Sequence, residues 1–226
     1  MLFLDLDGTL LDDERRHYAV YTDVLQDPEM RGVPIPSAEY WGLRKENKPI
    51  EEILKRSRLF PTKYQAYRDR FDAKLEAPEM LGLDSLKVGV ENSLGKLYTK
   101  TPIVLVTQRR DGEALESQLS SMGIRKYFVT VLAGAPKRER RPNPDARWKH
   151  KVALIRTRYR LPPTQAVYIG DTETDVKTAR DLGFEVFLVE GGHRKRDLQI
   201  KADPDRLVPD MPGALKYLLP GGRWQR

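Results

Sequence analysis

Short apolar runs alternate with stretches of helical periodicity through the second half of the chain, and no other feature restricts the possible folds as strongly. The apolar runs, rich in β-branched residues, are residues 102–107, 127–133, 166–171 and 185–192. The helical stretches between them are residues 113–122, 145–159 and 175–182. Strands that alternate with helices are typical of a parallel sheet with helices on both faces. The chain is therefore predicted to be an α/β protein with a doubly wound parallel sheet.

Residues 14–80 follow a different pattern. Their apolar and aromatic side chains recur at helical spacing, and prolines separate the periodic stretches. This pattern predicts an all-helical insert. A chain of 226 residues is long enough for one to two domains. We expect an α/β core made of residues 1–13 and 81–226, and a small helical domain made of residues 14–80.

The first apolar run, residues 2–6, has two carboxylates at its end. Its leucines and phenylalanine form a nearly continuous apolar stretch, which is typical of a strand buried on both faces of a sheet. Asp5 and Asp7 are two residues apart, so in a strand they share one face and repel each other. Such a pair needs a compensating positive charge.

Polar side chains also follow two of the later apolar runs. Thr107 and Gln108 stand at the end of one run, and Asp171, Glu173 and Asp175 stand at the end of another. In doubly wound sheets the chemistry lies beyond the carboxyl ends of the strands. We therefore expect these side chains to converge with the two N-terminal aspartates on one crevice.

The composition restricts which metal such a site could hold. The chain has no cysteine and three histidines, so disulfides and thiolate metal sites are excluded. A metal would be held by oxygen atoms or by histidine. This favours a hard cation such as Mg²⁺.

Charge and hydropathy bear on partners and location. No run approaches the roughly 18 apolar residues of a membrane span, and Asp5 stands where a signal peptide would be basic and then apolar. We therefore expect a cytoplasmic protein with no membrane partner. The net charge of +7 suits nucleic acid or a small anionic substrate. The basic stretches at residues 137–141 and 193–196 lack interleaved aromatics, so nucleic acid is not the expected partner.

The motifs resemble those of the haloacid dehalogenase-like superfamily, in particular its phosphatase branch. The stretch from Asp5 to Leu10, DLDGTL, is similar to the first motif of that family, and Thr107 at a strand end is similar to the second. Gly170 and Asp171, together with Asp175, are similar to the fourth. The helical insert occupies the place where the family inserts its cap. The resemblance implies a core with a cap domain and a small phosphorylated substrate.

The resemblance also implies roles for the residues of the first two motifs. Asp5 would be the nucleophile that forms an aspartyl-phosphate. Asp7 would protonate the leaving oxygen and then activate the water that cleaves the intermediate. Thr107 would donate its hydroxyl to a phosphoryl oxygen, assisted by Gln108 and nearby backbone N–H groups. A helix cap and nothing more is the less favoured alternative for Thr107.

The clustered acids would repel a phosphate unless a cation bridges them. Mg²⁺ would be held by Asp5, by the backbone carbonyl of Asp7, by Asp171 and by Asp175, either directly or through water. Asp175 could instead only stabilise the start of the following helix. Glu173 is expected to point away as a solvated acid.

The resemblance further implies a basic residue that holds the nucleophile and the phosphate together. Lys149, Lys151 and Arg141 are the candidates. Lys149 is preferred because it lies three residues before Val152, on the same side as an apolar stripe that includes Ile155. Lys151 is expected to point further off that stripe. The spacing from Arg141 to Asp171 is longer than in relatives with a similar motif.

The predicted activity is that of a Mg²⁺-dependent phosphoric monoester hydrolase. A phosphomutase uses the same aspartate pair, and a binding protein for phosphate or nucleic acid without turnover is a further alternative. Dehalogenase chemistry is disfavoured because halide leaves without a proton, whereas Asp7 is present. In the helical insert, Trp41 is expected in the core. The candidates to contact the distal end of a substrate are Arg44, Lys45, Asn47 and Lys48, although a basic surface loop is the favoured explanation for most of them.

Overall fold

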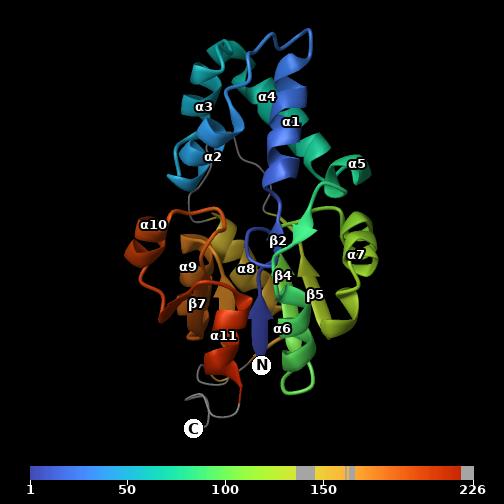
Figure 1. Ribbon diagram of the computed structural model, residues 1–226, viewed down its shortest axis with the longest axis vertical. Helices are drawn as coiled ribbons and strands as arrows, with labels where there is room; N and C mark the ends of the chain where they lie inside the picture. The colour runs from blue at the N-terminus through green and yellow to red at the C-terminus, as the bar shows by residue number, and fades with distance from the viewer. Residues whose placement is uncertain (136–145, 161, 163–165, 220–226) are drawn as a thin grey trace. The chain divides into compact units, whose positions relative to one another are not determined.

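A computed structural model describes residues 1–135, 146–160, 162 and 166–219. The chain forms two compact units, and Figure 1 labels their helices and strands. The first unit contains Met1–Leu11 and Leu86–Arg226, and the second contains Asp12–Ser85. The chain passes between them at β2 (Leu11–Asp12) and β3 (Ser85–Leu86), which pair with each other in a two-stranded sheet.

The first unit is built on a parallel sheet of six strands. The strands are β1 (Leu2–Leu4), β4 (Ile103–Thr107), β5 (Thr130–Ala133), β6 (Val167–Gly170), β7 (Glu185–Val189) and β8 (Arg206–Val208). Their order across the sheet is β5-β4-β1-β6-β7-β8. The chain builds outward from β1 to β5 and then starts again on the other side of β1 with β6. This reversal confirms the predicted doubly wound α/β fold and makes the carboxyl end of β1 its switch point.

Helices cover both faces of this sheet. Leu2 and Leu4 face α6 (Val90–Leu97), α7 (Gly112–Ser121) and α11 (Met211–Leu218) in one apolar cluster. Phe3 faces the opposite side, where its cluster includes α8 (Ala146–Arg156) and α9 (Glu173–Leu182). Because helices cover both faces of the sheet, the strand sequences are nearly continuous apolar runs.

Two shorter helical elements complete the described part of this unit. They are η2 (Arg125–Tyr127) and α10 (Arg196–Lys201). The run predicted as a strand from residue 127 therefore becomes one only at Thr130. Tyr127 belongs to the short helix η2 and not to the sheet, and its buried ring contacts the ring of Tyr98 at 5.2 Å between centroids.

The second unit is helical. Its elements are α1 (Glu14–Gln26), α2 (Ser37–Lys45), α3 (Ile50–Arg56), η1 (Pro61–Lys63), α4 (Tyr64–Leu75) and α5 (Pro78–Leu81). Its core is rich in aromatic side chains, and Tyr21 and Tyr40 lie 4.5 Å apart between ring centroids. Trp41 is buried in this core, as predicted. Among the described residues, no helix combines the length and the apolar character that crossing a membrane requires.

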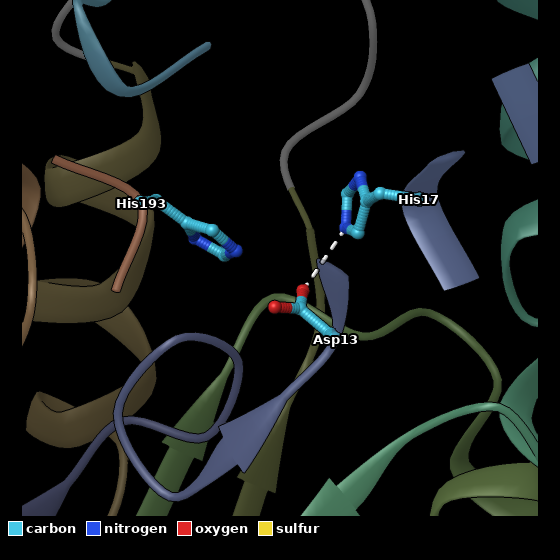
Figure 2. A group of neighbouring side chains, drawn as sticks. All are labelled: Asp13, His17 and His193. Carbon is cyan, nitrogen blue, oxygen red and sulfur yellow. Dashed lines mark ion pairs between the residues drawn. The ribbon is translucent and has the colours of Figure 1, made fainter. Parts of the chain in front are cut away.

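Charged groups are also buried in the helical unit. Arg16 Nε donates to Asp84 Oδ1 at 2.8 Å, and both side chains are almost fully buried. The next residue on α1 is His17, whose Nε2 lies 3.1 Å from Asp13 Oδ2, and Figure 2 shows the imidazole directed at this carboxylate. Burial lowers the pKa of His17 to about 4, against the opposing effect of Asp13. The imidazole is therefore neutral near pH 7 and donates to the carboxylate.

Candidate active site

Asp5 lies directly beyond β1, at the switch point of the sheet. Its backbone N–H donates to the carbonyl of Ile169 at 2.9 Å, so the pairing of β1 with β6 continues to this residue. Only 8% of Asp5 is exposed. The chain then turns sharply, and Gly8 in this turn has a φ of 75°. The Asp-Gly sequence of the first motif thus ends a buried strand in a conformation that favours glycine.

Asp171, the first residue after β6, is enclosed by this turn and by a second glycine. A Cβ on Gly8 would lie 2.4 Å from Asp171 Oδ2, and one on Gly192 would lie 2.2 Å from the same oxygen. Both positions are therefore restricted to glycine. Oδ2 accepts the backbone N–H of His193 at 2.6 Å. Burial raises the pKa of Asp171.

A buried lysine joins two of the carboxylates. Lys151 Nζ on α8 donates to Asp5 Oδ1 and to Asp175 Oδ1, at 2.7 Å in each case. Burial by itself would lower the pKa of Lys151, but Asp175 and Asp5 raise it well above its usual value. Burial raises the pKa of Asp5 to about 8, against the opposing effect of Lys151. The ammonium supplies compensating positive charge to Asp5 and Asp175.

The expectation that Lys149 faces the carboxylates is wrong. Lys149 is exposed, and its Nζ lies 5.4 Å from the centre of the Trp148 ring, whereas only 3% of Lys151 is exposed. The buried face of α8 contains Lys151, Val152 and Ile155. Lys151 precedes Ile155 by four residues, so the two share a face, whereas phasing from Val152 favoured Lys149. Arg141 lies outside the described residues.

Asp175 takes part in two arrangements at the start of α9. Its Oδ2 accepts the backbone N–H of Thr172 at 3.1 Å, and the Thr172 side chain accepts the backbone N–H of Asp175, so the two residues form a capping box. The Thr172 hydroxyl also donates to Oδ2, at 2.9 Å. Asp175 Oδ1 accepts from Lys151. Although burial opposes it, the lysine lowers the pKa of Asp175. Helix capping and membership of the carboxylate cluster thus occur together.

At the end of β4, Thr107 is buried beside the backbone of Arg109, whereas Gln108 is directed at α8. Thr107 is 1% exposed, and its Oγ1 accepts the backbone N–H of Arg109 at 3.4 Å. Gln108 Nε2 donates to the carbonyl of Arg147 at 2.9 Å, so its amide nitrogen is directed at α8. The predicted phosphate contact of Gln108 would therefore use its other polar atoms.

Glu173 is not a simple solvated acid, contrary to the prediction. Both of its carboxylate oxygens accept from Arg194, at 2.7 Å each. The partner, Arg194, comes from the loop after β7. A guanidinium and a carboxylate can form two parallel hydrogen bonds, and such a bidentate pair forms even at a position that is half exposed.

The sequence analysis did not identify two basic residues that lie near the aspartates. Arg109 Nε and Nη2 donate to Asp7 Oδ2 and Oδ1 at 2.7 and 2.6 Å. Lys87 Nζ donates to the carbonyl of Gly8. Arg109 could have been suspected, because it lies two residues after Thr107 at a functional strand end. Lys87 carries no comparable signal.

Three carboxylates form a group that could hold a cation. Among the described residues, Asp5, Asp171 and Asp175 each offer an oxygen within 4.8 Å of the others. An all-oxygen donor set suits a hard divalent cation. The carboxylate of Asp7 is not part of this group, since it pairs with Arg109.

A doubly wound sheet with a group of polar side chains at its switch point is typical of α/β enzymes. A sequence model of the haloacid dehalogenase-like hydrolases matches residues 2–189. The chain therefore belongs to this family, as the first and fourth motifs predicted.

Known proteins support the same assignment. A phosphoglycolate phosphatase from Synechococcus elongatus is 25% identical over 92% of this chain and 91% of its own length. One from Rhodobacter capsulatus is 27% identical over 87% of each chain. A haloacid dehalogenase-like hydrolase from Streptococcus pneumoniae superimposes with a TM-score of 0.75 at 22% identity, over 96% of this chain and 97% of its own. The prediction of an enzyme of the phosphatase class is confirmed by these relatives.

Proposed function

We propose that the protein is a Mg²⁺-dependent phosphatase that hydrolyses a small phosphorylated metabolite through an aspartyl-phosphate on Asp5. The observation that carries this proposal is the bridge from Lys151 to Asp5 and Asp175, next to Asp171. A buried ammonium against the nucleophile places positive charge where the phosphoryl oxygens would come to lie. Phosphoryl transfer depends mainly on such positioning and charge stabilisation.

The reaction proceeds in two displacements. In the first, an Asp5 oxygen bonds to phosphorus, the bond to the leaving oxygen breaks, and Asp7 gives that oxygen a proton. In the second, Asp7 takes a proton from water, whose oxygen bonds to phosphorus and releases Asp5. Thr107 would donate its hydroxyl to a phosphoryl oxygen. Asp7 has then regained its proton and the phosphoryl group leaves as inorganic phosphate, so the protein is unchanged after one turnover.

Asp5, Asp171 and Asp175 would hold Mg²⁺ together with the backbone carbonyl of Asp7. The all-oxygen cluster fits this cation, and the enclosure of Asp171 by Gly8 and Gly192 leaves its carboxylate little freedom to turn away. A bound divalent cation would lower the pKa of Asp5, which burial raises, and so favour the ionised nucleophile.

The substrate is proposed from the relatives and from the helical unit. Both curated relatives are phosphoglycolate phosphatases, so 2-phosphoglycolate is the first substrate to test. Residues 14–80 are proposed to act as a cap domain that selects it. Lys45 pairs with Glu14, so Arg44, Asn47 and Lys48 are the better candidates to contact a substrate.

The test measures inorganic phosphate released from a panel of phosphorylated metabolites, with and without Mg²⁺, by the wild-type protein and by Asp5→Asn. Turnover that requires both Mg²⁺ and Asp5 is the expected result. No release from any member by a folded protein would overturn the hydrolase assignment. Phosphorus NMR on sugar phosphates would then detect transfer to a sugar hydroxyl, and a steep salt dependence of nucleic-acid affinity would indicate a binding protein.

A further inference from the structure

Arg109 contacts both oxygens of the Asp7 carboxylate. The distances from Arg109 Nε to Oδ2 and from Nη2 to Oδ1 are 2.7 and 2.6 Å. The Arg109 side chain is 4% exposed and that of Asp7 is 21% exposed. Two parallel hydrogen bonds between planar groups restrict rotation of the carboxylate, which one bond from an ammonium would not do.

The backbone holds Arg109 in place for this contact. Strand β4 pairs directly with β1, with Leu105 opposite Leu4, so the chain segments that follow the two strands emerge side by side. The backbone N–H of Arg109 also donates to Thr107 Oγ1 at 3.4 Å. Arg110, the next residue, is exposed. Of these two consecutive arginines, only the first is buried against the aspartate.

We propose that Arg109 is a positioning residue that orients Asp7 for proton transfer. This inference rests on the proposed phosphatase function. Asp7 carries its proton on one oxygen before it donates to the leaving group, and the other oxygen can still accept from Arg109. After donation, both oxygens accept. The guanidinium therefore keeps the carboxyl group oriented in both halves of the cycle and takes no proton itself.

The leaving group distinguishes this role from a merely structural one. A misplaced proton donor slows cleavage most when the leaving oxygen is strongly basic, and least when it is a stable anion such as nitrophenolate. The ratio kcat/KM reports the step that breaks the bond to the leaving group. A loss of folding or of phosphate binding would lower this ratio equally for all leaving groups.

The experiment measures kcat/KM for a series of substituted phenyl phosphates, with Arg109→Ala, Arg109→Lys and the matched control Arg110→Ala. We expect Arg109→Ala to lose about 100-fold with phenyl phosphate and less than about 10-fold with p-nitrophenyl phosphate, within the range of general acid catalysis. Arg109→Lys should fall between wild type and Arg109→Ala. Arg110→Ala should match wild type. Added guanidinium should restore part of the loss in Arg109→Ala, and should restore nothing when Asp7→Asn is also present.

Three outcomes would overturn the inference. The first is an equal loss across the series, which would make Arg109 a structural or phosphate-binding residue. The second is full activity of a folded Arg109→Ala. The third is an additive effect of Arg109→Ala and Asp7→Asn, since residues that act as a unit are not additive. Circular dichroism checks folding. If Arg109→Ala does not fold, the same series of phenyl phosphates is compared between Arg109→Lys and the wild type. If the wild type hydrolyses nothing in the series or in the metabolite panel, that result contradicts the proposed phosphatase function itself, whereas the three outcomes above contradict only the role of Arg109.

Discussion

Lys151 Nζ lies 2.7 Å from Asp5 Oδ1, although the two residues are 146 positions apart in the chain. The same ammonium contacts Asp175, which is also buried. Each of these charges would be costly to bury alone, and together they form a compensated group. Substitutions at Lys151 should therefore change both activity and stability.

We expect Lys151→Met to lower kcat at least 100-fold, because it removes the charge next to the nucleophile. The same change leaves the buried carboxylate of Asp175 without its charged partner, so it should also lower the free energy of unfolding by about 3 to 5 kcal/mol. Phosphate release and urea unfolding measure the two effects. Lys149→Met, on the exposed side of the same helix, is the matched control and should change neither. The opposite ranking of the two lysines would contradict the site described above.

Asp5→Asn should abolish turnover and leave the protein folded. Asparagine is nearly the same size but cannot act as the nucleophile, and we expect kcat to fall at least 1,000-fold. Burial raises the pKa of Asp5 to about 8 in the metal-free protein, so the neutral amide should not destabilise it. Thermal unfolding checks the second point. Activity above a tenth of wild type would exclude Asp5 as the nucleophile.

Removal of divalent cations should abolish activity, and Mg²⁺ should restore it. The carboxylate group of Asp5, Asp171 and Asp175 carries too much negative charge to bind a phosphate without a cation. Asp171→Asn should raise the Mg²⁺ concentration that gives half-maximal activity by at least tenfold. It should also reduce the rise in melting temperature that Mg²⁺ causes in the wild type. Full activity in excess chelator would contradict the proposed metal requirement.

The stability of the helical unit should depend on pH through His17. Burial lowers the pKa of this imidazole to about 4, against the effect of Asp13, and Arg16 and Arg44 lower it further. Because an unfolded histidine titrates near 6.5, the unfolded chain binds more protons between these values, and stability falls as the pH decreases through this window. From pH 7 to pH 5 the loss should be about 2 kcal/mol.

The check is urea unfolding of the wild type and of His17→Gln at pH 7 and pH 5. Titrating groups that do not contact His17, including Asp5, affect both proteins alike, so the difference between the two pH dependences reports on His17 together with its partner Asp13. Identical pH dependences would show that the imidazole is not buried in its neutral form.

Arg16 and Asp84 form a buried ion pair at 2.8 Å in the helical unit. Asp84→Leu should lower the free energy of unfolding by about 3 to 5 kcal/mol, because it leaves a buried guanidinium without its main partner. Combining it with Arg16→Met should recover much of this loss, since no buried charge then remains from the pair. Additive losses in the double variant would show that the two residues stabilise the unit independently.

The sequence was sufficient for the fold because the sheet is buried on both faces. Strands of this kind read as short apolar runs, and the helices between them show a clear period, so both element types and their alternation were predicted. The strand after residue 127 began later than expected, because an aromatic residue buried in a turn has the same apolar signature as one in a strand. Sequence alone cannot distinguish these two origins of burial.

The sequence by itself predicted that Asp5, Asp171 and Asp175 lie close together, because each follows a strand or begins a helix at the edge where parallel strands end, and the structure brings these three carboxylates together. The role of Thr107, at the end of β4, stays a prediction. The tertiary structure alone decided which basic residues meet the carboxylates. Lysine and arginine side chains are long, and small differences in helix phase or loop path determine whether their charges are buried or solvated. The choice of Lys151 over Lys149 and the pairing of Arg109 with Asp7 therefore depend on packing between distant segments, which local sequence patterns do not encode.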